Sequence, residues 1–144
     1  MSREELERLN DEGIGAWDRH DPDGFVKLLA DDFVWIDDTT PEPMRTRDQA
    51  RAYTQAWFTA FPDMHIRTTN QVCADDQMAC ELEFTGTNTG TLAMGGMEIP
   101  ATGKAVTSRG TYFMKCENGK ITEFHTHPDA AGMMMQLGLM GASA

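Results

Sequence analysis

The spacing of hydrophobic residues changes once along the chain, near His65. Before this point, apolar residues recur at helical spacing in three segments, which begin after Ser2, at Pro22 and near Asp48. The segment 33–37, FVWID, is rich in β-forming residues and interrupts this pattern. The first part of the chain is therefore predicted to form three helices, with one strand between the second and the third.

From His65 onward, apolar and polar residues alternate, which is typical of strands with one buried face. The pair Asn118-Gly119 is a strong signal for a hairpin between the last two strands. We expect a mobile loop or two ragged strand ends at 86–103, and a short helix at 130–137. The four predicted strands cover residues 65–72, 78–87, 106–116 and 121–127.

These elements predict a single α+β domain over residues 1–144. The expected architecture is a curved antiparallel sheet with the helices packed on one face. A strongly bent sheet that is capped by helices encloses a cone, and the mouth of the cone is a natural site for a small molecule.

The tail FHTHPDAAGMMMQLG places three ionisable residues, His125, His127 and Asp129, two positions apart. A strand directs such residues to one face. Counting back from a two-residue Asn118-Gly119 turn pairs His125 with Tyr112, and the positions nearer the turn on this face are mostly apolar. We therefore expect the three side chains to face an apolar hollow.

A carboxyl or imidazole group in such a hollow is driven towards its neutral form by desolvation, which suits proton transfer to and from carbon. Asp129 is also a favoured N-cap for the helix that follows, so capping alone remains an alternative. The two histidines could likewise be polar strand residues without chemistry. A metal site is disfavoured, because alternate side chains on one strand are about 7 Å apart, whereas the ligands of one ion converge from several elements.

Other side chains could line the cavity or simply fill the core. The first group is aromatic and consists of Trp17, Trp35 and Trp57. His65 could point inward or outward. Arg109, on the opposite face from His125 by the same count, is expected at the surface or at an interface. The methionines at 133–135 are expected to close the core, to form a dimer seam or to act as a lid, because Met adapts to irregular apolar surfaces.

Composition and charge exclude several classes of protein. The 144 residues carry a formal net charge of -11, so we expect no nucleic-acid partner, because nucleic-acid binding needs a basic face. Three cysteines without CxxC spacing argue against a disulfide framework or a thiolate zinc site. The N-terminus lacks the apolar core of a signal peptide, and no apolar run reaches the length of a membrane span. We expect a soluble, cytoplasmic protein with no membrane contact.

Six segments between Trp17 and Leu139 carry a family resemblance: AWDRHDPDGF, WFTAFPDMHI, GTNTG, PATGKAV, ENGKITEF and PDAAGMMMQLGL. In this order and spacing the chain resembles SnoaL-like proteins of the NTF2-like superfamily, which include aromatic polyketide cyclases. The resemblance implies a cone-shaped α+β barrel with three N-terminal helices and a short C-terminal helix, often dimeric, with a hydrophobic pocket. It also implies no cofactor, as in the cyclases. An aspartate near their last strand is the acid–base catalyst of an aldol closure, and Asp129 is the matching position. Many relatives carry other residues at His125 and His127.

We therefore expect a small enzyme that acts on an aromatic or polycyclic polyketide-like ligand by metal-free acid–base chemistry, such as aldol-type cyclisation. Asp129 and His127 would transfer the proton, while His125 and Tyr112 would orient the reacting group. One alternative is a cofactor-independent hydroxylase of a polyketide pathway. Another is a non-catalytic ligand-binding or dimerisation module, and a homodimer is expected. The residues expected to hold the rings are Trp17, Trp35, Trp57 and His65.

Overall fold

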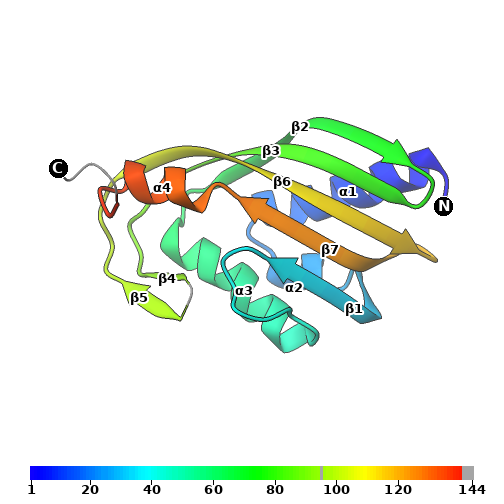
Figure 1. The fold of residues 1–144 in the computed structure, drawn as a ribbon, viewed down its shortest axis with the longest axis horizontal. Coiled ribbons are helices and arrows are strands. Elements are labelled where there is room, and N and C mark those ends of the chain that lie inside the picture. Colours follow the sequence, from blue (N-terminus) through cyan, green and yellow to red (C-terminus); the bar gives the residue numbers. More distant parts are fainter. Residues whose placement is uncertain (95, 141–144) are drawn as a thin grey trace.

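One curved sheet and a layer of helices form the fold (Figure 1). The structure, a computed structural model, describes residues 1–94 and 96–140. The predicted order of three helices, an interrupting strand, four long strands and a terminal helix is confirmed, although the interrupting strand begins earlier, at Leu29. The helices are α1 (Arg3–Asp18), α2 (Pro22–Val26), α3 (Arg47–Ala60) and α4 (Ala130–Gln136). The strands are β1 (Leu29–Asp37), β2 (His65–Ala74), β3 (Gln77–Thr87), β4 (Leu92–Met94), β5 (Met97–Ile99), β6 (Ala105–Glu117) and β7 (Lys120–Pro128).

The five long strands form one sheet in the order β1-β7-β6-β3-β2. Its ladders are antiparallel except for β1 with β7, which run parallel, so the predicted α+β class with a mainly antiparallel sheet is confirmed. Figure 1 shows β2, β3 and β6 arching over the helices. The β6–β7 hairpin has φ of 51° at Asn118 and 78° at Gly119, as a two-residue type I′ turn requires. The stretch 86–103, expected as a loop or ragged ends, contains the β4–β5 hairpin.

Side-chain caps fix the starts of the two long helices. Ser2 Oγ accepts the N–H of Glu5 at 3.1 Å, and Thr46 and Gln49 form a reciprocal capping box at the start of α3. These caps satisfy backbone donors that have no partner inside the helix. Helix α1 packs on β2 and buries an apolar stripe that includes Leu6, Leu9 and Ala16. The helical layer is thereby fixed opposite the sheet.

The β6–β7 hairpin contains one extra residue, Thr122. Near the turn the pairing is as predicted, with Cys116 opposite Ile121. The next pair joins Lys115 to Glu123, so Thr122 is left unpaired and forms a β-bulge. Its Oγ1 donates a hydrogen bond to the carbonyl oxygen of Lys115 at 3.1 Å.

The bulge reverses the faces that we expected for the end of β7. Tyr112 pairs with Thr126 instead of His125, and Thr111 pairs with His127. A shift of one residue moves every side chain beyond it to the other face of the sheet. His125 and His127 therefore lie on the outer face. The expectation that they face the apolar hollow is wrong for His125, which does not border the cavity, whereas His127 does border it. Arg109 is exposed, as expected. It lies two positions before Thr111 on the same outer face as the histidines, so the expectation that it lies on the opposite face from His125 is wrong.

The connections between the β4–β5 hairpin and the main sheet are held by Asn88, which is fully buried. Its Nδ2 donates to the carbonyl oxygens of Ala60 and Gly90 at 3.1 and 2.9 Å. Its Oδ1 accepts the N–H and the hydroxyl hydrogen of Thr102, both at 2.9 Å. A Cβ atom on Gly90 would lie 1.8 Å from the carbonyl oxygen of Thr59, so only glycine fits there. These contacts give structural roles to Asn88 and Gly90 of the GTNTG segment and to Thr102 of the PATGK segment.

Helix α4 packs on β6 and covers one end of the sheet. The side-chain amide of Gln136 donates to the carbonyl oxygen of Thr107 at 2.9 Å and accepts its N–H at 2.8 Å. Met133 and Leu137 are buried in an apolar cluster with side chains of α3, β3 and β6. Of the alternatives expected for these methionines, closing the core is the one that Met133 fulfils. Met135, by contrast, is exposed.

Candidate ligand cavity

A cavity of about 110 Å³ lies between the sheet and helices α1 and α3. For comparison, an engineered apolar cavity of about 150 Å³ binds benzene. The cavity of this protein is smaller than that one, but it is partly open to solvent. Edge-to-face contacts hold the rings of its wall, such as Trp17 against Trp35 with centroids 6.4 Å apart. The aromatic residues of the wall include Trp17, Trp35, Tyr53, Trp57, Phe84 and Phe124.

The polar centre of the cavity is the carboxylate of Asp37, which ends β1 and is 4% exposed. Tyr53 from α3 donates its hydroxyl hydrogen to Oδ2 at 2.7 Å, and the Thr126 hydroxyl from β7 donates to the same oxygen. Thr39 donates its N–H and its hydroxyl hydrogen to Oδ1 at 2.7 and 2.6 Å. Trp35 Nε1 donates to Thr126 Oγ1 at 2.9 Å. Two strands, a helix and a loop thus meet at one buried carboxylate.

A second polar group joins α1 to the sheet. Tyr112 donates its hydroxyl hydrogen to Asn10 Oδ1 at 2.5 Å, and Asn10 Nδ2 donates to Thr68 Oγ1 at 3.3 Å. Thr68 Oγ1 lies 3.2 Å from the Tyr112 hydroxyl oxygen and closes the ring. Each of the three side chains finds a donor and an acceptor inside this ring, which is what burial of polar groups requires.

Burial raises the pKa of both cavity tyrosines. For Tyr53 the main cause is loss of solvation, and the negative charge of Asp37 raises the pKa further. For Tyr112 loss of solvation is again the main cause, with a smaller contribution from Cys80. Both phenols therefore keep their hydrogens at neutral pH and act as hydrogen-bond donors rather than as bases.

Asp129 lies at the rim of the cavity, between β7 and α4. Its Oδ1 accepts the N–H of Gly132 at 2.9 Å, so its expected role as the N-cap of α4 is confirmed. Its own N–H donates to the carbonyl oxygen of Arg109 at 3.0 Å, which anchors the backbone at the rim. The side chain is exposed. Its catalytic role stays a prediction.

The two histidines lie on the outer face of the sheet, and only one of them borders the cavity. His127 borders the cavity, and its half-exposed ring has Nδ1 3.0 Å from Asp38 Oδ1 and stands edge-to-face with Phe113. His125 does not border it, and its Nε2 lies 3.7 Å from the carboxylate of Glu123. The parts that we expect both histidines to play in catalysis stay predictions.

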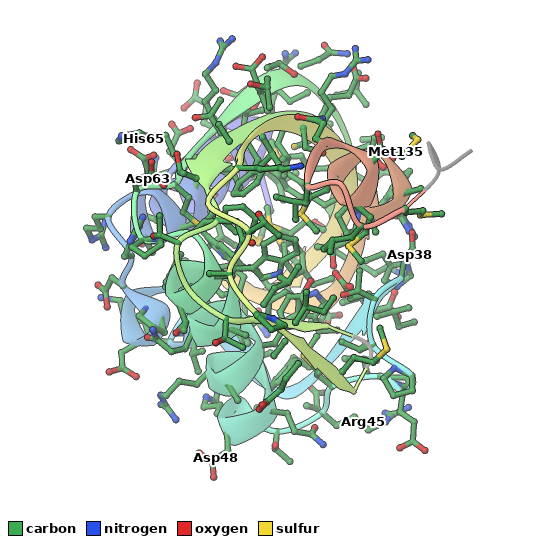
Figure 2. The ribbon with its side chains drawn as sticks, turned by 90° about the vertical axis from the view of Figure 1, so that its left-hand side faces the viewer. Asp38, Arg45, Asp48, Asp63, His65 and Met135 are labelled. Carbon is green, nitrogen blue, oxygen red and sulfur yellow. The ribbon has the colours of Figure 1, made fainter. Side chains whose placement is uncertain are left out.

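The predicted ring-binding residues line the cavity with one exception. Trp17, Trp35, Trp57 and Tyr112 are part of its wall. His65 lies elsewhere: its side chain is 77% exposed, with Nδ1 3.2 Å from Asp18 Oδ1. Figure 2 shows His65 at the margin of the molecule. Ligand contacts of all these residues stay predictions.

Sequence reasoning missed Asp37, Tyr53 and Thr126 as a polar group. One signal was available, because strict alternation in FVWID puts Asp37 on the same face as Phe33 and Trp35. Phe33, Trp35 and Asp37 are all buried in the structure.

Two further observations concern the described part of the chain. Within residues 1–94 and 96–140, no group of three or more His, Cys, Asp or Glu side chains is arranged to hold a metal ion. None of the helices seen there has the length and apolar character needed to cross a membrane.

Several solved structures have the same fold. AclR from Streptomyces galilaeus, provisionally described as a hydroxylase, matches with a TM-score of 0.84 at 22% identity, over 99% of this chain and 87% of AclR. A provisional SnoaL-like polyketide cyclase from Jannaschia sp. CCS1 matches with a TM-score of 0.77 at 22% identity, over 96% and 92% of the two chains. For IdmH from Streptomyces antibioticus, a provisional polyketide cyclase, the TM-score is 0.74 at 22% identity, over 92% and 97%.

These similarities define the fold class, and the predicted NTF2-like fold is confirmed. The family follows from the sequence: the model of the SnoaL-like polyketide cyclases matches residues 8–137, so the chain belongs to this family. No relative was found among the curated proteins.

Proposed function

We propose that this protein is an enzyme that binds an aromatic, polyketide-like ligand in its cavity and transfers a proton at that ligand. The observation that carries the proposal is an aromatic-lined hollow whose rim holds the carboxylate of Asp129. Membership of a polyketide cyclase family supports it. An aldol-type ring closure begins with removal of a proton next to a carbonyl group, which needs a positioned base.

In this proposal Asp129 removes the proton, because its side chain is held at the rim by the N–H of Gly132. His127 precedes Asp129 by two residues and is paired with Asp38, and it would pass the proton to solvent. The cavity wall would hold the ring system of the ligand against the base, since positioning contributes much of the rate in such reactions.

The test uses hydrogen–deuterium exchange next to the carbonyl group of 2-tetralone, a two-ring ketone, followed by NMR in deuterated buffer. We expect the wild-type protein to accelerate the exchange and Asp129→Asn to lower this acceleration by about 100-fold or more, the usual range for a general base. Asn caps helices as well as Asp does, so the unfolding free energy should stay the same.

Asp129→Ala is the matched variant, because it removes both the base and the cap. We expect it to lose the exchange activity and also to destabilise the protein by about 1 kcal/mol. An Asp129→Asn protein that exchanges 2-tetralone at the wild-type rate would remove Asp129 from the reaction. A wild-type protein that binds 2-tetralone without accelerating exchange would favour a ligand carrier.

A second candidate is a metal-free hydroxylase, which the similarity to AclR over 99% of this chain favours. Here the same rim groups would ionise a phenolic substrate, whose ring carbon adds dioxygen to form a hydroperoxide. Cleavage of the O–O bond with loss of water then leaves a quinone, so the substrate itself supplies the electrons and one oxygen atom of dioxygen stays in the product. Incorporation of labelled oxygen from dioxygen into the product separates this reaction from ring closure, which consumes none.

We also infer that two copies of the chain associate through the outer face of the sheet. Phe113 on β6 and Ile36 on β1 are 49% and 41% exposed there, and both pair with His125 on β7, so the two apolar side chains lie in one row across the sheet. Phe113→Glu should convert a dimer into a monomer in light scattering coupled to gel filtration. A wild-type protein that elutes as a monomer at high concentration would contradict this inference.

A further inference from the structure

The carboxylate of Asp37 already accepts as many hydrogen bonds as it can. Its carboxylate accepts four hydrogen bonds, from the N–H and the hydroxyl of Thr39, from Tyr53 and from Thr126. A carboxylate has about four lone-pair sites for acceptance, so its capacity is filled. As a result Asp37 itself offers little to a guest in the cavity, and its influence must act through the two hydroxyl groups that face it.

Each of these hydroxyl groups has a single hydrogen, and that hydrogen points at Asp37. The Tyr53 oxygen has two further polar neighbours: Thr39 Oγ1 at 3.5 Å, whose hydrogen is also given to Asp37, and the indole N–H of Trp57, which can occupy one of its lone pairs. The Thr126 oxygen accepts one hydrogen bond, from Trp35 Nε1. What remains free on both oxygens is lone pairs. The polar centre therefore presents hydrogen-bond acceptors to the cavity.

The other polar group of the cavity does not offer the same site. The Tyr112 hydrogen goes to Asn10, so Thr68 must be the donor in its contact with the Tyr112 oxygen. Asn10 in turn donates to Thr68, which closes the ring. These contacts satisfy the three side chains among themselves and tie α1 to the sheet.

We propose that the group Asp37–Tyr53–Thr126 is a binding site for a hydroxyl group of the ligand. The cavity would take an aromatic ring that carries a phenolic or enolic O–H, with the O–H donating to Tyr53 or Thr126. A carbonyl or ether oxygen at this position meets lone pairs and the negative charge of Asp37, so it is disfavoured. Asp37 is a positioning residue here, because it fixes the hydroxyl hydrogens of its neighbours. The inference rests on the proposed aromatic ligand, but not on the proposed reaction.

The experiment compares 4-ethylphenol with 4-ethylanisole, which differ by a methyl group on the oxygen. Dissociation constants come from chemical-shift titrations of the protein with residues 1–144. We expect the wild-type protein to bind the phenol at least about 10-fold more tightly, as one hydrogen bond in a buried site permits. Equal affinities, or tighter binding of the ether, would overturn the proposal.

Variants separate hydrogen-bond direction from hydrophobicity and size, because the ratio of the two constants is compared between proteins. Asp37→Asn frees one or both hydroxyl hydrogens for the guest, so the ratio should fall to about 2 or less. If that variant does not fold, Tyr53→Phe tests the same point by removing one acceptor, and the ratio should fall at least about 3-fold. Asp38→Asn, at the exposed neighbour, should keep the wild-type ratio.

The outcome is distinguishable from that of the proposed function. A protein whose Asp129→Asn variant exchanges 2-tetralone normally, but which prefers the phenol, loses the proposed reaction and keeps this site. A protein that exchanges 2-tetralone through Asp129 without any preference for the phenol keeps the reaction and loses this site. If neither 4-ethylphenol nor 4-ethylanisole binds, both the hydroxyl site and the proposal of an aromatic ligand are overturned.

Discussion

The hydroxyl of Tyr53 donates a 2.7 Å hydrogen bond to the carboxylate of Asp37, and the two residues come from a helix and a strand that are separated by a loop. This contact closes the wall of the cavity where β1 ends. It gives the cavity a polar centre on rigid elements, which hold side chains more precisely than loops do. The rim that carries Asp129 is a different part of the same hollow.

Replacement of Asp37 should be costly for stability. In Asp37→Ala, four donors lose their acceptor in a buried site, and we expect the free energy of unfolding to fall by about 2–4 kcal/mol. Urea denaturation followed by circular dichroism measures the change. The neighbouring Asp38→Ala removes an exposed carboxylate and should cost at most about 1 kcal/mol. Similar losses for the two variants would mean that the hydrogen bonds of Asp37 add little.

Asn88 offers an independent test of the connections around β4 and β5. Asn88→Ala leaves the carbonyl oxygens of Ala60 and Gly90 and the donors of Thr102 without their partner, so a loss of about 2–3 kcal/mol is expected. Thermal unfolding gives the comparison. Asn70→Ala, which removes only an exposed contact with Glu81, is the control and should stay within about 0.5 kcal/mol of wild type.

The three cysteines should differ in reactivity. Burial raises the pKa of the Cys116 thiol to about 12, and burial also raises the pKa of Cys80. Only the thiolate reacts with a disulfide reagent, so these two thiols should stay unreactive from pH 7 to pH 9 in the folded protein. Cys73 is only half-buried and should react first. A colorimetric thiol titration should count one fast thiol in buffer and three in denaturant, and three fast thiols in buffer would contradict the packing.

Most of the elements could be predicted because their signals are local. Helical spacing, alternation and the Asn-Gly turn each depend on residues that are close together in the chain. The same local reasoning identified Asp129 as a helix cap, and the cap is present. It also identified the tryptophans as core or cavity residues, and all three line the cavity.

Local reasoning could not predict which side chains of β7 face the core. The count from the turn was right for Cys116 and Ile121, and it failed one residue later at Thr122. Nothing about Thr122 alone predicts a bulge. With the bulge, Phe124 lies opposite Met114 and both are buried, whereas without it Glu123 would face the core. Burial of an unpaired carboxylate is unfavourable, so core packing selects the bulged register.

The chain by itself therefore fixes most of the helices and long strands, the position of the β6–β7 turn and the residue that caps the final helix, since each of these follows from neighbours in sequence. The fold decides which side chains surround the buried Asp37, and that the imidazoles of His125 and His127 lie on the outer face. Asp37 obtains its partners Tyr53 and Thr126 from positions 16 and 89 residues away. Contacts over such separations exist only once the sheet and the helices have packed together, which is why no local pattern could reveal them.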